Sequence, residues 1–316
     1  MSAATDHGAG PAGRPPAHSL TTITRSTMSR ISITNSVFGS DAIASLELQQ
    51  AVGVTDLDLK DGLFGRTVVD LGPDEARRIA ERSEQLGLNP YSMSTTFFDD
   101  EIAKGEQHFR EQFLDRVGAA IEVASIVKPD VIRLMAAQAA GRQSGAPLID
   151  YLDDGFDWVI PAYREAIGRF GDAGFGVVIE NEVGASICSS PADVLALFDA
   201  IADAGPVSFT WDIQNMWETG HFPSLEVFEQ LRPVIGYVHV KGGAMVDGVL
   251  HKASLRDADW PVLDIVRAVH VSGVSPVICV NPCHGRTPTG YNGIAVALDD
   301  IRFVAEATES AVAVAA

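Results

Sequence analysis

The chain alternates short apolar, strand-like segments with helix-like segments, and this alternation limits its possible folds more than any other feature. The strand-like segments span residues 31–38, 54–60, 90–98, 130–138, 176–182, 207–215, 235–241 and 276–282. The helix-like segments span residues 40–51, 73–87, 101–127, 191–203, 224–232, 259–271 and 295–312. Regular alternation of this kind predicts parallel strands that are joined by crossover helices.

Two α/β folds use this alternation: an open, doubly wound sheet and a closed (β/α)8 TIM barrel. Eight strand segments without a glycine-rich dinucleotide-binding loop favour the barrel. The length of 316 residues agrees, because such barrels take about 250 residues. We therefore expect a flexible leader at residues 1–29, rich in Gly, Pro, Ser and Thr, and a single-domain barrel over residues 30–316. The small and polar residues 139–157 are expected to form a loop that covers the site as a lid.

Composition excludes several classes of partner. The formal net charge is −19, which repels a phosphate backbone, so we expect no nucleic-acid partner and a small sugar as the ligand. The cysteines Cys188, Cys279 and Cys283 lack the spacing of a disulfide framework, which indicates a reducing compartment. No apolar run has the roughly 18 residues of a membrane span, so we expect a cytoplasmic protein without a membrane partner.

Four of the expected strands carry, at or near their ends, a polar side chain that suits a hard metal ion. These side chains are Glu180, Asp212, His239 and Asn281. The carboxyl ends of barrel strands form the active site of this fold, so the four should lie close together. Residues two apart share a face of a strand, which places Glu182 beside Glu180 and Lys241 beside His239.

Two carboxylates and an imidazole are costly to bury together unless a cation neutralises them. Oxygen-rich ligation with one nitrogen favours Mn²⁺, with Mg²⁺, Co²⁺ and Zn²⁺ as alternatives. Glu180, Asp212 and His239 are the expected ligands, and Asn281 is a candidate for the fourth. The alternatives are a structural polar network at the barrel rim for the first three, and a hydrogen bond to a loop for Asn281.

The alternation of side chains along a strand and the helix and loop patterns also predict which other residues are buried and which are exposed. Trp211 lies on the opposite face of its strand from Asp212 and should pack against the outer helices. Cys279 should behave as a small core residue. His108, His251 and His270 fall in helix or loop patterns and are expected at the surface.

Four motifs resemble those of a known superfamily. IENE at 179–182 stands where the family often has Glu-Asn-His, WDIQNMWETGH at 211–221 resembles its Asp-x-x-His or Asp-x-x-Asn turn, and YVHVKG at 237–242 is close to its His-Val-Lys-Asp. Residues 255–269 resemble the family's Gly-Asp-x-Asp-Trp entry to a helix. The chain thus resembles the sugar isomerase/epimerase-like (xylose isomerase-like) TIM barrels, which include ketose 3-epimerases, hydroxypyruvate isomerase, inosose dehydratase and endonuclease IV.

The resemblance implies metal ligation by Glu180, Asp212 and His239. The family's fourth ligand is a Glu on the last strand, where this chain has Asn281. In the epimerase branch two glutamates exchange the substrate proton from opposite faces, and an amide cannot take a proton. The endonuclease branch is disfavoured by the acidic surface and by the small number of His residues. The superfamily also implies a homo-oligomer.

The sequence therefore predicts a divalent-metal-dependent isomerase or epimerase that acts on a small sugar or keto-sugar through an enolate or enediol. A metal-dependent dehydratase or lyase on a keto-sugar or oxidised glycoside is the alternative that Asn281 encourages. A non-catalytic sugar-binding barrel with a degraded metal site is the alternative from a different class. The enzyme and the binding protein would differ in metal content.

Particular roles follow for the remaining polar residues. Glu180 and Lys241 are candidate bases, and Glu182 is the third candidate catalytic residue. The candidates for substrate binding are Asn35, Arg133, Asn215 and His284. Other interpretations are open: Lys241 as a solvated rim residue, Glu182 in an ion pair with Lys241 or Arg133, and Asn35 and Arg133 as structural residues.

Overall fold

The strands close into a parallel eight-stranded barrel, as the sequence predicts. The computed structural model describes residues 29–282 and 286–315. The strand order around the barrel is β1-β10-β7-β6-β5-β4-β3-β2. The barrel strands are β1 (Arg30–Thr34), β2 (Asp56–Leu59), β3 (Asn89–Ser94), β4 (Val131–Met135), β5 (Gly176–Glu180), β6 (Val207–Asp212), β7 (Ile235–Val240) and β10 (Val277–Val280). The expected leader, apart from Ser29, lies outside the described residues, as do Cys283 and the predicted substrate-binding residue His284.

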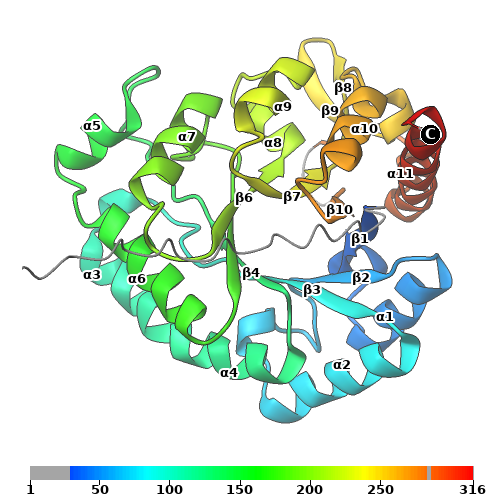
Figure 1. Ribbon diagram of the computed structural model, residues 1–316, viewed down its shortest axis with the longest axis horizontal. Coiled ribbons are helices and arrows are strands. Elements are labelled where there is room, and N and C mark those ends of the chain that lie inside the picture. The colour runs from blue at the N-terminus through cyan, green and yellow to red at the C-terminus, as the bar shows by residue number, and fades with distance from the viewer. Residues whose placement is uncertain (1–28, 283–285, 316) are drawn as a thin grey trace, which may run out of the picture.

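Helices surround this ring of strands (Figure 1). They are α1 (Ala42–Ala51), α2 (Pro73–Leu86), α3 (Glu106–Gln112), α4 (Val117–Val127), α5 (Leu148–Asp153), α6 (Val159–Asp172), α7 (Pro191–Ala200), α8 (Ile213–Glu218), α9 (Leu225–Leu231), α10 (Val262–Ser272) and α11 (Gly293–Ala315). Within the described part of the chain, no helix has the length and apolar character needed to cross a membrane.

Local sequence explains where several helices begin and end. Helix α2 starts with Pro73 at its first position, the Glu75 carboxylate accepts a hydrogen bond from the Gly72 N–H, and Gly87 ends the helix with φ 68°. Helix α7 starts after Ser190, whose hydroxyl accepts from the Asp193 N–H. These caps fix the helix ends, and so they fix the lengths of the loops that carry the site.

Parallel register sets which side chains point into the barrel. Strands β1 and β10 close the ring, with Arg30 opposite Val277 and Ile33 opposite Val280. Trp211 on β6 is fully buried and its ring stacks on Phe228 of α9, with centroids 6.3 Å apart. This confirms the predicted packing of Trp211 against the outer helices, and it leaves its neighbour Asp212 facing inward.

The sequence-based helix assignments are wrong in three places, one of which is α6, where no helix was expected. Segment 139–157, expected to be a loop, contains α5, whose buried Leu148 and Leu152 pack into the core. The single helix expected over 101–127 is two helices that are separated near Phe113. There the backbone turns so that the Phe113 ring packs against Phe98 and Phe109.

A β-hairpin follows β7 and was not predicted. It consists of β8 (Gly242–Val246) and β9 (Val249–Ala253), paired antiparallel. Asp247 and Gly248 form its two-residue turn with φ 51° and 76°, the signature of a type I′ hairpin turn.

The expected surface position is wrong for His270, and His108 has a partner that was not expected. His270 is buried, and its Nδ1 accepts a hydrogen bond from the Ser29 N–H at 3.0 Å. His108 is partly buried, with its Nε2 2.7 Å from an Asp100 carboxylate oxygen. In both cases the partner lies outside the helix that carries the histidine, so helical periodicity does not reveal it.

Candidate metal and substrate site

The four predicted strand-end residues meet inside the mouth of the barrel. Glu180 and Asp212 are the last residues of β5 and β6, His239 lies on β7, and Asn281 directly follows β10. All four are buried. One ligand atom each of Glu180, Asp212 and His239 lies within 4.8 Å of the others. The parallel register explains this, because Asp212 is directly opposite His239, which in turn is opposite Cys279.

His239 lies between two carboxylates. Its Nδ1 is 2.8 Å from Glu180 Oε1, and its Nε2 is 3.2 Å from Asp58 Oδ2. Burial alone would lower the pKa of His239, but the two carboxylates outweigh it and raise the pKa to about 9. Asp58 on β2 also accepts a hydrogen bond from the Tyr237 hydroxyl at 3.0 Å. Asp58 was not predicted as a site residue, although the alternation of Asp and Leu in the strand DLDL was a usable signal.

Two buried cations balance the two strand-end acids. The Arg133 guanidinium forms an ion pair with the Glu180 carboxylate, and together with His239 it keeps the pKa of Glu180 well below its usual range despite burial. The Lys241 ammonium lies 3.1 Å from Asp212 Oδ2 and donates to Asn215 Oδ1 at 2.7 Å. Burial opposes the charge of Lys241, but the Asp212 carboxylate outweighs it and raises the pKa. Lys241 is thus a buried, protonated residue, and its interpretation as a solvated rim lysine is wrong.

Glu182 has a different environment from Glu180. Burial, followed by the negative charge of Glu180, raises the pKa of Glu182 to about 7. Instead of the ion pair considered with Lys241 or Arg133, its Oε1 accepts hydrogen bonds from the Val183 N–H at 2.8 Å and from Asn215 Nδ2 at 3.2 Å. This carboxyl group can therefore change protonation state near neutral pH.

Asn281 places its amide between two expected ligands. Its Nδ2 is 3.2 Å from Asp212 Oδ2 and 3.2 Å from His239 Nδ1, while its Oδ1 accepts from the Thr34 hydroxyl at 3.4 Å. In this orientation the amide nitrogen donates to the Asp212 carboxylate, and it cannot donate to His239 Nδ1 while that nitrogen carries a proton. Rotation of the amide by half a turn would present Oδ1 to the same space.

Two further asparagines hold the backbone of the site. Asn181 donates to the Asp212 carbonyl at 3.0 Å and accepts from the Asp212 N–H at 2.9 Å, which ties β5 to β6. Asn35 donates to the Asp61 carbonyl and accepts from the Lys60 N–H, each at 2.7 Å. Both side chains thus contact backbone groups, and Asn35 does not line the inner cavity described next.

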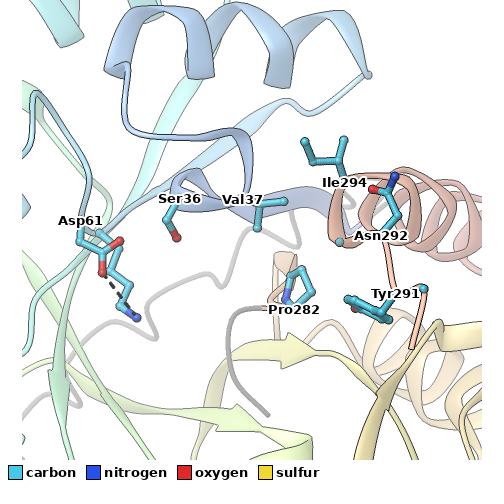
Figure 2. A pocket seen from close by; sticks show the side chains of 10 residues that line it. Ser36, Val37, Asp61, Pro282, Tyr291, Asn292 and Ile294 are labelled. Atoms are coloured by element: carbon cyan, nitrogen blue, oxygen red, sulfur yellow. Dashed lines mark ion pairs between the residues drawn. The ribbon is translucent and has the colours of Figure 1, made fainter. Parts of the chain in front are cut away.

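Two of the cavities at the mouth adjoin each other. The inner cavity has a volume of about 70 Å³. Its lining consists of Lys60, Thr96, Asp99, Arg133, Met135, Glu180, Glu182, Asn215 and Asn281. The predicted substrate-binding residues Arg133 and Asn215 are among them, whereas Lys60, Thr96 and Asp99 were missed. The outer cavity has a volume of about 860 Å³ and lies between the ends of β1 and β2 and the start of α11 (Figure 2).

The donor set fits a divalent cation. Two carboxylates and one imidazole nitrogen supply hard oxygen donors and one nitrogen, as Mn²⁺ and Mg²⁺ sites do. Glu180, Asp212 and His239 would hold the ion, and Asn281 would join them with its amide oxygen turned inward. The proton on His239 Nδ1 would have to leave, because a ligating nitrogen must offer its lone pair.

The fold and these strand-end residues define a TIM barrel with a polar, buried site at its carboxyl-end mouth. The family model of the xylose isomerase-like TIM barrels matches residues 50–306, so the chain belongs to this family. This confirms the family resemblance seen in the motifs. No curated protein matches the sequence.

Solved structures with the same fold include enzymes and a metal complex. A xylose isomerase-like TIM barrel protein from Mycobacterium smegmatis, in complex with magnesium, is 16% identical with a TM-score of 0.66, covering 90% of this chain and 98% of that one. The probable 3-DHS dehydratase AsbF from Bacillus anthracis is 14% identical with a TM-score of 0.67, covering 87% and 98%. The 3-keto-D-glucoside 4-epimerase YcjR from E. coli is 15% identical with a TM-score of 0.63, covering 88% and 99%.

Proposed function

We propose that this protein is a divalent-metal-dependent enzyme that removes a proton beside the carbonyl group of a small sugar or keto-sugar and proceeds through an enolate or enediol. The observation that carries this proposal is the meeting of Glu180, Asp212 and His239 at one point of the barrel mouth, next to a cavity that Glu182 lines. Solved structures with the same fold support it, since they include a 3-keto-D-glucoside 4-epimerase, a probable dehydratase and a magnesium complex.

The proposed ligands are Glu180, Asp212 and His239. The cation, when bound, would polarise the substrate carbonyl and stabilise negative charge on its oxygen. Arg133 and Lys241 keep the two acidic ligands ionised and fixed in position. The Arg133 side chain lines the inner cavity while it is paired with Glu180, and Lys241 is buried and is not among the lining residues.

Glu182 is the proposed base. Glu180 is a poor proton acceptor, because Arg133 and His239 hold its pKa low, and Lys241 is already protonated. Glu182 lines the inner cavity, and its pKa of about 7 is well matched to proton transfer at neutral pH. Lys241 acts through Asn215: the ammonium holds the amide oxygen, and the amide nitrogen donates to Glu182.

The amide of Asn281 favours a one-base reaction over symmetric two-base epimerisation. A second acid is nevertheless present, because Asp99 lines the same inner cavity and burial raises its pKa. In an elimination, Glu182 would take the proton next to the carbonyl and Asp99 would give a proton to the departing hydroxyl, which leaves as water. A dehydratase reaction on a keto-sugar is therefore the second candidate function.

Deuterium exchange tests the proposal directly. Wild-type protein with Mn²⁺ in D₂O should exchange the hydrogen next to the carbonyl of keto-sugars, as followed by NMR. Glu182→Gln should lose exchange by about 100-fold or more while keeping its metal. The exposed Glu226→Gln on α9 is the matched control and should behave as wild type.

Metal analysis separates an enzyme from a binding barrel. Asp212→Ala should lose both metal and exchange while keeping its far-ultraviolet circular dichroism spectrum. A wild-type protein that neither retains a divalent metal nor gains stability when one is added would refute the proposed enzyme. It would favour a sugar-binding barrel instead.

A further inference from the structure

The outer cavity is directly adjacent to the inner one. Lys60, at the end of β2, lines both cavities, and the consecutive residues Asn281 and Pro282 line one each. Figure 2 shows Pro282 and Tyr291 on one side of the outer cavity and Ser36 and Val37 on the other. A ligand whose reacting end lies beside Glu182 would therefore extend past Lys60 into the outer cavity.

The sizes of the two cavities differ by an order of magnitude. The inner cavity, at about 70 Å³, has room for only a few atoms, whereas the outer one has about 860 Å³. A single water occupies about 30 Å³ of liquid. The inner cavity thus fits the reacting carbons of a sugar ring and their hydroxyls, while the outer cavity is larger than the rest of a monosaccharide needs.

The outer cavity carries apolar side chains that a free sugar would not require. Tyr291, Val37 and Ile294 line it together with Pro282. Ile294 is 53% exposed at the start of α11. Lys252 lies over the Tyr291 ring at 6.0 Å from its centroid, on the β9 side. Apolar side chains that are at least partly exposed and that converge on a cavity indicate a ligand with an apolar part.

The charges of the outer cavity disfavour a phosphate group. Among its lining residues the cationic side chain is Lys60, which lies 4.0 Å from the Asp61 carboxylate of the same cavity, while the neighbouring Lys252 donates to the Pro282 carbonyl at 2.7 Å. A phosphate there would face this carboxylate within a protein of net charge −19. An uncharged group avoids that repulsion.

We propose that the outer cavity is a subsite for an apolar, ring-shaped group joined to the reacting sugar. The substrate class is then an aryl glycoside or its oxidised form, with the sugar in the inner cavity and the aglycone against Tyr291 and Ile294. This inference rests on the proposed function only in assigning the sugar to the inner cavity.

Calorimetric titration of three probes tests the subsite: methyl β-D-glucoside, phenyl β-D-glucoside and inorganic phosphate. The phenyl glycoside should bind wild type about tenfold more tightly than the methyl glycoside, because the ring buries apolar surface in the outer cavity. Tyr291→Ala and Ile294→Ala should reduce this preference at least about threefold and leave methyl glycoside binding unchanged.

Matched controls lie outside the cavity. Tyr151→Ala on α5 removes a partly exposed tyrosine, and Val271→Ala on α10 removes an aliphatic side chain that is 65% exposed. Both should keep the full preference for the phenyl glycoside. Circular dichroism melts of all four variants show whether each is folded before binding is measured.

Several outcomes would overturn the subsite. Wild type could bind the two glycosides with equal affinity or bind neither of them. The preference for the phenyl glycoside could survive Tyr291→Ala and Ile294→Ala, or wild type could bind phosphate in a way that those variants abolish. Deuterium exchange without a phenyl preference would overturn the subsite and keep the proposed function. A preference for the phenyl glycoside without deuterium exchange would keep the subsite and overturn the proposed function.

Discussion

At the scale of single residues, the key feature is the imidazole of His239 between two carboxylates. Asp58 Oδ2 lies 3.2 Å from Nε2, and Nδ1 faces Glu180 and Asn281 at the mouth. A carboxylate behind a ligating histidine fixes its tautomer and ring orientation. Asp58 is itself held by the Tyr237 hydroxyl, so the whole arrangement is built into the barrel interior.

Replacing Asp58 with Asn tests this positioning role. We expect Asp58→Asn to weaken Mn²⁺ binding by about 10- to 100-fold, as loss of such a partner does in other metal sites, with titration calorimetry as the measurement. Asp56→Asn is the control, because Asp56 is equally buried on β2 but pairs with Arg30. Equal losses in the two variants would mean that Asp58 supports only the fold.

The raised pKa of His239 predicts a pH dependence of stability. In the metal-free protein, a folded pKa of about 9 against an unfolded value of 6.5 means that protonated His239 favours folding. This contribution is complete below pH 6.5 and is lost as pH rises through 9. The measurement uses Cys188→Ala, because the buried Cys188 thiol would titrate near pH 9 once the chain unfolds. In urea unfolding of this variant, the free energy of unfolding should fall by on the order of 2–3 kcal/mol between pH 7 and 9.5. A flat profile would contradict the paired imidazolium.

Strand parity was sufficient to predict that Glu180, Asp212 and His239 meet, because each stands at the end of a regular strand. It could not predict that Arg133 and Lys241 would neutralise them. Those pairings depend on how far each side chain reaches across the closed barrel. Asp58 was missed for the same reason, since its partner is 181 positions away in sequence, from residue 58 to residue 239.

At the scale of secondary structure elements, the β8–β9 hairpin continues directly from β7 and so supports Lys241. Its Asp247-Gly248 turn was a signal that the sequence contained. Helices with a clear cap, such as α2 and α7, were predicted to within a few residues. Strands were predicted too long at their carboxyl ends, because residues that follow a strand in sequence, such as Gln214, already belong to a helix.

Gly242 tests the close packing of this hairpin. A Cβ atom at Gly242 would lie 2.3 Å from the Ser254 carbonyl oxygen and 2.4 Å from that of Ala253. We expect Gly242→Ala to destabilise the protein by about 1–3 kcal/mol in urea unfolding, because backbone must move to relieve this overlap. Gly118→Ala is the control, since Gly118 lies in α4 with open space around it and Ala favours a helix. Similar effects of the two substitutions would contradict the close approach.

At the scale of the whole molecule, the alternation of segments predicted the barrel because each βα unit is local in sequence. Closure between β1 and β10 is the longest-range pairing, and only the number of repeats indicated it. The site depends on this closure, because Thr34 of β1 contacts Asn281 after β10 while Glu180 and Asp212 come from β5 and β6. The proposed metal therefore joins elements from separate parts of the chain.

Metal binding should therefore stabilise the folded barrel as a whole. A ligand that binds only the folded state at about 100 times its Kd adds roughly 2.7 kcal/mol. We expect Mn²⁺ to raise the Tm of wild type by several degrees after chelator treatment, as measured by calorimetry at pH 7.5. In Asp212→Ala the rise should disappear, because a carboxylate ligand is lost, whereas Asp56→Asn, altered at a residue outside the donor set, should keep it. A rise of the same size in Asp212→Ala would place the ion elsewhere on this acidic protein.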